Sequence, residues 1–263
     1  MGFGTVRRSF RYAYAEVVIV NLTNDGWEAI YQRAHGLLAT KLAARWREDE
    51  RGPFWVELLA AITQHDNNQK EFRGDNYLTL VGAPADFMIA SGSPLEQAKR
   101  VVDDASYAGR YVALMTSMHT TNIYAARRDE GFAAFLDEQK GLQKKWRRAL
   151  RLSKADAERG YAVMNWCDRL SLILCGRELP SDARRLEVAP LPGGETSFVW
   201  EREDKTVGLE PWPFRDDRFE VGVEVKMLSQ LRFESDEALR AALNDAPTEV
   251  RRWAFLNSPL GKR

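Results

Sequence analysis

The sequence predicts a mainly α fold, in which a helical bundle carries a smaller antiparallel β layer from the C-terminal part, so that the whole is α+β. Residues 25–176 show long stretches of helical periodicity, whereas residues 186–257 show short alternating runs, Gly-Gly and several prolines. A strand-like run ends the first 24 residues. We therefore expect an N-terminal extension with a strand (1–24), a helical core (25–176) and a β-rich part packed on that core (177–263).

Composition and charge narrow the class of protein. Of the 263 residues, 44% are hydrophobic and 29% are charged, as in soluble globular proteins. Lys plus Arg and Asp plus Glu both number 38, so net charge favours neither a nucleic-acid polymer nor an anionic membrane as partner. No apolar run approaches the roughly 20 residues of a membrane-spanning helix.

The start of the chain and its two cysteines favour a cytoplasmic protein. An arginine cluster imitates the basic start of a signal peptide, but Glu16 interrupts the apolar stretch that should follow. Cys167 and Cys175 would lie about 12 Å apart along one helix, which is too far for a disulfide. We expect both to be core residues in a reducing compartment.

Capping residues and apolar spacing place the first helices of the core. Asp25 followed by Glu28 forms a capping box, which predicts a helix from there to Trp46. A second helix is expected near Pro53, and a third from the capping box Ser93–Glu96. The apolar stripe expected for the first helix consists of Ile30, Ala34, Leu37, Leu38, Leu42 and Trp46.

Three more helical stretches complete the predicted bundle. Apolar side chains recur at helical spacing in Tyr107–Met118 and in Phe132–Trp146. The last long helix should begin at Ser153, with Asp156 completing its cap. Its apolar stripe is Tyr161, Met164, Leu172 and Cys175.

The C-terminal part is predicted to be sheet with one short helix. Three segments alternate apolar and polar side chains, as half-buried strands do: Leu186–Val188, Ser197–Trp200 and Phe219–Val225. A short helix is expected over Asp236–Leu243, followed by a strand over Val250–Phe255. We expect this part to pack on the bundle as a layer.

Five polar side chains interrupt the apolar faces of the predicted helices. They lie three or four positions from apolar stripe residues and include all three histidines of the chain: His35, His65, Asp66, His119 and Asp168. A buried carboxylate is costly unless it is paired, hydrogen-bonded or bound to a metal. Three imidazoles and two carboxylates in a bundle core suit a divalent metal ion. Each histidine alone could instead be a satisfied core residue, and Asp168 could pair with Arg169.

The order His, His-Asp, His, Asp, each on a separate helix, resembles the HD-domain superfamily of metal-dependent phosphohydrolases. The residues that carry the resemblance are His35 in Gln32–Gly36, His65 and Asp66 in Thr63–Asn67, His119, and Asp168 in Asn165–Leu170. Gly26-Trp27-Glu28 and Gln64-His65-Asp66 also resemble an uncharacterised bacterial family, a domain of unknown function with the same signature. The HD resemblance covers residues 27–176.

The resemblance implies a metal site and a reaction. His35, His65, Asp66 and Asp168 would bind one divalent ion, such as Mn, Fe, Mg or Zn. The reaction implied is hydrolysis of a phosphoester, on a small phosphorylated and nucleotide-like molecule, by a metal-activated water. Asp66 and His119 would be catalytic, with His119 orienting the water, protonating the leaving group or binding a second ion.

Two other functions stay open on the sequence. The first is a non-catalytic HD-like protein that binds a ligand or acts as a regulator. The second is oxygenase chemistry on two irons, which the short supply of histidines disfavours. If the protein is a phosphohydrolase, basic residues near the motifs could neutralise phosphate, and the candidates are Arg33, Lys70, Arg73 and Arg169.

Overall fold

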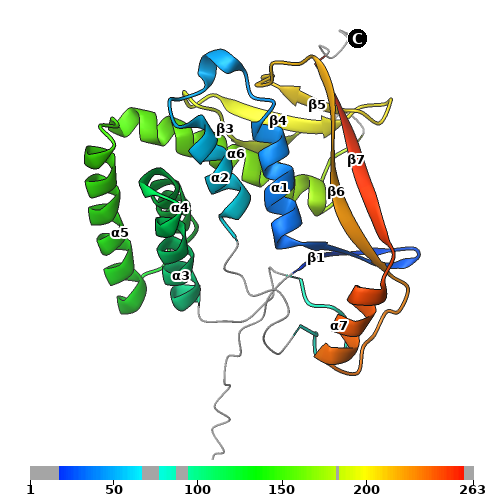
Figure 1. Ribbon diagram of the computed structural model, residues 1–263. Helices are drawn as coiled ribbons and strands as arrows, with labels where there is room; N and C mark the ends of the chain where they lie inside the picture. Colours follow the sequence, from blue (N-terminus) through cyan, green and yellow to red (C-terminus); the bar gives the residue numbers. More distant parts are fainter. Residues whose placement is uncertain (1–17, 67–76, 87–93, 182–183, 258–263) are drawn as a thin grey trace, which may run out of the picture.

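The computed structural model describes residues 18–66, 77–86, 94–181 and 184–257, and it shows an α+β fold (Figure 1). The prediction of a mainly α fold with a small C-terminal β layer is wrong. Helices hold 47% of the residues, and they pack against a curled, mixed sheet of seven strands. The sheet is larger than predicted because strands from both ends of the described chain join it.

The sheet has the strand order β1-β2-β6-β7-β5-β4-β3. All pairings are antiparallel except the parallel contact between β5 and β7. The hairpin β1–β2 pairs with β6, so it brings the N-terminal strands into the C-terminal sheet. The strands are β1 (Val18–Thr23), β2 (Gly26–Tyr31), β3 (Leu186–Pro190), β4 (Thr196–Glu201), β5 (Val207–Glu210), β6 (Arg218–Leu228) and β7 (Thr248–Leu256).

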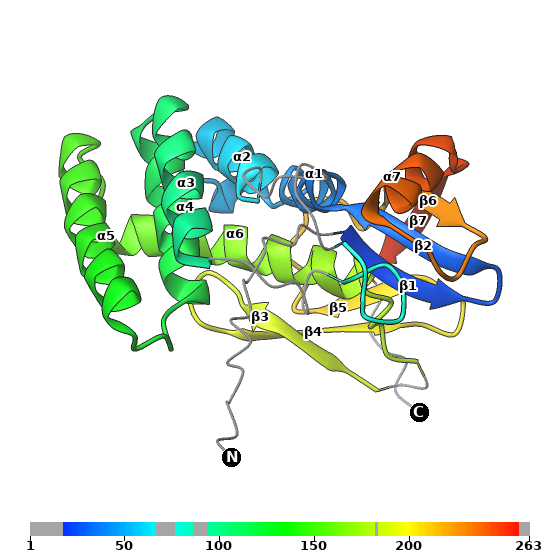
Figure 2. The same ribbon diagram turned by 90° about the horizontal axis from the view of Figure 1, so that it is seen from below.

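The longest helix, α6, occupies the centre of the molecule. Figure 2 shows it crossing between the other helices and strands β3, β4 and β5, and it contacts α1, α2, α4 and β3. The helices are α1 (Gln32–Ala43), α2 (Trp55–Gln64), α3 (Pro94–Tyr107), α4 (Arg110–Ile123), α5 (Glu130–Ala149), α6 (Lys154–Cys175) and α7 (Asp236–Asp245), with a 3₁₀ turn η1 (Glu48–Glu50). Within the described parts of the chain, no helix combines the length and apolar character needed to span a bilayer.

The predicted start of the first helix is wrong, because residues 26–31 form strand β2. Asn24 and Asp25 make the tight turn between β1 and β2, and Gly26 follows with a φ of +123°. A side chain at Gly26 would collide with the carbonyl oxygen of Leu228. The turn and the pairing with β6 therefore prevail over the capping-box pattern, and α1 begins only at Gln32.

Most other elements lie where the spacing predicts them. The Ser153 cap is confirmed, since its Oγ accepts a hydrogen bond of 3.0 Å from the backbone N–H of Asp156. Tyr107 ends α3, and Gly109, with a φ of +122°, separates it from α4. The sequence missed the short strand β5. Glu16, which interrupts the apolar stretch near the start of the chain, and Ser93, used in predicting a cap, lie outside the described residues.

The main core lies between α6 and its neighbours on both sides. Helices α1, α2 and α4 and the inner face of the sheet contribute to it. Trp46 and Trp166 meet edge to face with ring centroids 5.3 Å apart. Both cysteines, Cys167 and Cys175, are buried and free, as the sequence predicts. Leu37, which was predicted to be in the stripe of the first helix, is 47% exposed.

Candidate metal centre

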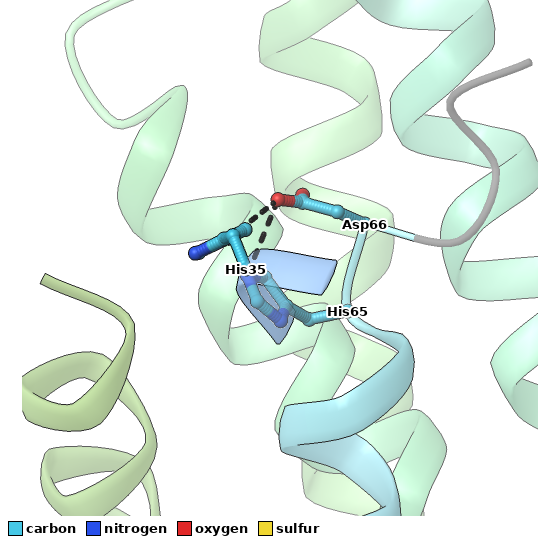
Figure 3. Close-up of side chains that lie close together, drawn as sticks. All are labelled: His35, His65 and Asp66. Carbon is cyan, nitrogen blue, oxygen red and sulfur yellow. Dashed lines mark hydrogen bonds and ion pairs between the residues drawn. The ribbon is translucent and has the colours of Figure 1, made fainter. Parts of the chain in front are cut away.

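The fold brings the five polar side chains singled out in the sequence into one buried cluster. His35 comes from α1, His119 from α4 and Asp168 from α6. His65 is the C-cap residue of α2, and Asp66 follows it. In Figure 3, His35, His65 and Asp66 lie close together where α1 meets the end of α2. Residues from four separate segments thus converge on one point.

A glycine next to His35 allows this convergence. A β-carbon at Gly36 would lie 2.8 Å from the carbonyl oxygen of Thr63, so a larger residue would push α1 away from α2. One turn further on, the hydroxyl groups of Thr40 and Thr63 are 2.7 Å apart. The close packing of α1 on α2 places His35 beside Asp66.

Two imidazole nitrogens and two carboxylate oxygens form a closed ring. Nε2 of His35 lies 3.3 Å from Oδ2 of Asp66 and 3.4 Å from Oδ1 of Asp168. Nε2 of His65 lies 3.3 Å and 3.1 Å from the same two oxygens. The centre of four atoms spaced in this way lies about 2.0–2.4 Å from each, which matches metal–nitrogen and metal–oxygen bonds. The buried His and Asp groups could therefore hold a metal ion.

Hydrogen bonds on the far side of each imidazole fix how it faces this ring. Nδ1 of His65 donates to the carbonyl oxygen of Ile62 over 2.7 Å. The Ser171 hydroxyl donates to the carbonyl oxygen of Asp168, so it accepts from Nδ1 of His35, also over 2.7 Å. Because each Nδ1 makes a hydrogen bond on the far side of its ring, each imidazole turns its Nε2 towards the carboxylates. Metal-binding histidines have this arrangement.

Charges within the cluster shift the pKa values of its members away from their ordinary values. Burial alone would raise the pKa of Asp66, but His65 and His35 hold it well below its ordinary value. Burial would lower the pKa of His65, but the charges of Asp66 and Asp168 raise it well above the ordinary value. The pKa of Asp168 is lowered, again against burial, by His65 first. Two ionised carboxylates thus share a site in which only protons or a cation can balance them.

His119 lies at the edge of the ring. Its Nε2 is 3.8 Å from Oδ2 of Asp168, and its ring centroid is 5.0 Å from that of His65. With these two residues it makes a second group that could hold a metal ion. Its Nδ1 is buried and has no hydrogen-bond partner among the described residues. Burial lowers the pKa of His119, although Asp168 acts in the opposite direction.

Exposure indicates where the site opens. The side chains of His35 and His65 are 0% and 1% exposed, whereas that of Asp66 is 22% exposed. Asp66 is therefore the most accessible member of the ring.

The basic residues proposed for phosphate are not assembled at the cluster in the parts of the chain that are described. Arg169 points elsewhere and forms a partly exposed ion pair with Glu178, at 3.6 Å. It is therefore not the partner of Asp168. Arg33 is exposed on α1, and Lys70 and Arg73 lie outside the described residues.

Sequence reasoning placed Tyr161 in the apolar stripe of its helix and Asn165 one turn before Asp168, but it gave neither a place in the cluster. Tyr161 lies with its ring 6.2 Å from that of His119, and its hydroxyl donates to Oδ1 of Asn165 over 3.4 Å. Burial, and then the charge of Asp168, raise the pKa of Tyr161, so its hydroxyl stays protonated at neutral pH. The signal was present, since Tyr161, Asn165 and Asp168 follow each other at four and three positions on one helix face.

One comparison with known proteins gives a match. A family model described as "Protein of unknown function (DUF3891)" matches residues 18–230, which is most of the chain. Among curated proteins and among solved structures, nothing matches. The resemblance to a family of unknown function is therefore confirmed at that level, and the HD-domain resemblance gains no support from these comparisons.

Proposed function

We propose that this chain, which belongs to the DUF3891 family of proteins of unknown function, is a metal-dependent phosphohydrolase acting on a small, nucleotide-like phosphoester. The observation that carries the proposal is the closed ring of two Nε2 atoms and two carboxylate oxygens, 3.1–3.4 Å apart at each step. A divalent ion bound there would supply an activated water and polarise a phosphoryl oxygen.

The donor set favours some ions over others. Mg²⁺ prefers oxygen ligands and keeps several waters, whereas imidazole suits Fe, Zn and other transition metals. Two imidazoles and two carboxylates therefore favour Mn²⁺, Fe²⁺ or Zn²⁺. In this proposal His35, His65, Asp66 and Asp168 are the ligands, and Ser171 and the carbonyl group of Ile62 orient the imidazoles.

Two residues are proposed to take part in the chemical step, and two more to bind the leaving group. Asp66 is the most exposed member of the ring, so its carboxylate can accept a hydrogen bond from the attacking water. His119 turns its Nε2 towards Asp168, and its Nδ1 has no hydrogen-bond partner among the described residues, so its imidazole can donate to or accept from the leaving oxygen. The Tyr161 hydroxyl and Asn165 lie beyond it and would bind the leaving group.

The test is hydrolysis by metal-depleted protein to which single divalent metals are returned. We expect cleavage of bis-p-nitrophenyl phosphate or of nucleotides that appears only with added metal, and no cleavage by His65→Ala. All three histidines belong to the cluster, so the matched control is Asp137→Asn on α5, whose side chain is 80% exposed.

The alternative has its own outcome. Saturable nucleotide binding by protein that carries no metal and hydrolyses none of these esters would favour a non-catalytic ligand-binding protein.

A further inference from the structure

One buried side chain beside the cluster has no partner that the described chain supplies. Gln32, the first residue of α1, is 1% exposed. Neither its Nε2 nor its Oε1 has a hydrogen-bond partner among the described residues. Native proteins leave few buried amides unsatisfied, because burial removes hydrogen bonds to water without replacing them. A donor and an acceptor are therefore both kept open at this position.

The position of Gln32 relates it to the metal centre. It lies one turn before His35 on α1, and residues three apart on a helix have β-carbons about 5–6 Å apart. Side chains on a helix lean towards its N-terminus, so the Gln32 carboxamide extends past the first turn of α1. Figure 1 shows that this end of α1 lies on the same side of the molecule as the end of α2, from which His65 and Asp66 come.

The N-terminus of α1 is not capped by the side chain of its N-cap residue, Tyr31. The helix has 12 residues, and its first turn contains no acidic residue. First-turn N–H groups and the positive end of the helix dipole attract anions. The amide N–H₂ of Gln32 adds a donor at the same place, and its Oε1 adds an acceptor.

We propose that Gln32 and the N-terminus of α1 form a second binding subsite of the metal centre, which takes an oxyanion that has a hydroxyl group beside it. Nε2 donates to a phosphoryl oxygen, and Oε1 accepts from the hydroxyl. The inference rests on the proposed function and narrows the substrate class to phosphoesters of hydroxyl-bearing compounds, such as polyol, sugar or nucleoside phosphates.

Thermal unfolding without ligand tests whether the amide is kept for a ligand. Gln32→Met replaces an unsatisfied amide with an apolar group of similar size, so we expect a melting temperature about 2–4 °C above wild type. The matched control is Gln139→Met. Gln139 is 4% exposed, but it accepts a hydrogen bond of 2.9 Å from Ser117, so this control should melt below wild type.

Two binding measurements accompany it. Inorganic phosphate should raise the melting temperature of chelator-treated wild type but not that of Gln32→Met. With metal restored, wild type should prefer glycerol 2-phosphate to isopropyl phosphate, which has the same carbon skeleton without hydroxyls. Gln32→Met should lose that preference, with kcat/KM for glycerol 2-phosphate about 10–100-fold lower and metal content unchanged.

The outcomes separate this inference from the proposed function. The subsite is ruled out if Gln32→Met melts below wild type. It is also ruled out if inorganic phosphate leaves the melting temperature of chelator-treated wild type unchanged. Metal-dependent hydrolysis that is indifferent to Gln32→Met also overturns it, while the proposed function stands. A phosphate response that depends on Gln32, in a protein that cleaves no phosphoester, supports the subsite and overturns the proposed function.

Discussion

Two buried carboxylate clusters along α6 differ in how their charges are balanced. Near the end of α6, Glu28 is 2% exposed and receives hydrogen bonds from two guanidinium groups. Nη2 of Arg177 lies 2.8 Å from its Oε2, and Nη1 of Arg251 lies 2.6 Å from its Oε1. Arg251 also donates to the carbonyl groups of Leu174 and Cys175. This cluster is complete, because fixed cations neutralise the carboxylate and cap the helix.

The His–Asp cluster is incomplete in this sense, because no arginine or lysine among the described residues neutralises its carboxylates. Its two carboxylates face Nε2 atoms whose imidazoles already use their Nδ1 protons elsewhere. Charge balance must come from extra protons or from a cation. Burial of charge is common to both clusters, so burial alone does not mark a functional site. What distinguishes the candidate functional site is that its carboxylates face imidazoles, whose charge depends on protonation, instead of permanently charged guanidinium groups.

Removing a carboxylate from the incomplete cluster should have the largest effect. Asp168→Asn keeps the shape but replaces an anionic ligand with an amide. We expect loss of bound metal and a fall in hydrolysis of about 1000-fold or more, equivalent to about 4 kcal/mol of transition-state stabilisation. Elemental analysis and phosphodiesterase assays measure both, with Asp137→Asn as control. Full metal content in Asp168→Asn would remove it from the ligand set.

Removing the carboxylate of the complete cluster should lower the stability of the protein and leave its metal content unchanged. Glu28→Ala leaves two guanidinium groups without their carboxylate, and one of them, Arg251, is largely buried. We expect a loss of about 3 kcal/mol in the free energy of unfolding, with metal content unchanged. Urea denaturation measures the first and elemental analysis the second. A variant as stable as wild type would show that the ion pairs contribute nothing net.

Replacing His119, at the edge of the ring, should have a smaller effect, and that effect should be confined to turnover. His119→Ala removes a side chain whose Nδ1 has no partner in the described chain, and the four ring ligands stay. We expect kcat to fall about 100-fold while metal content and KM change little. Steady-state kinetics on metal-loaded protein measures this. Loss of metal in this variant would instead make His119 a ligand of the tightly held ion.

The smallest effect concerns acid pH at the complete cluster. Burial alone would raise the pKa of Glu28, but Arg177 and Arg251 lower it below its ordinary value of 4.5. A lowered folded pKa means stability that is present above the unfolded value and lost as pH falls through the folded value. The stability difference between wild type and Glu28→Gln should therefore be constant near neutrality and shrink below about pH 4.5. Urea denaturation across this range measures it, and a difference that grows in acid contradicts the account.

Local signals explain which parts of the fold and site were predictable. Helix caps such as Ser153 and polar interruptions such as Asp168 can be read within one or two turns. The β1–β2 hairpin was missed, because Asp25 and Glu28 also fit a capping box, and that pattern competes with the turn at Asn24–Gly26. Pairing with β6, about 200 residues away, adds to the turn in favouring the strand. The open amide of Gln32 was equally hidden, since hydrogen-bond satisfaction depends on every neighbour in space.

Thermal unfolding of the purified protein, before and after treatment with a chelator, shows directly whether a metal ion completes the His–Asp cluster. If the His–Asp cluster is completed by a metal ion, removing that ion should lower the melting temperature by several degrees, and returning it should restore the curve. His65→Ala should not respond to the chelator. Superimposable curves for wild type with and without chelator, from protein that contains no metal, would contradict the account.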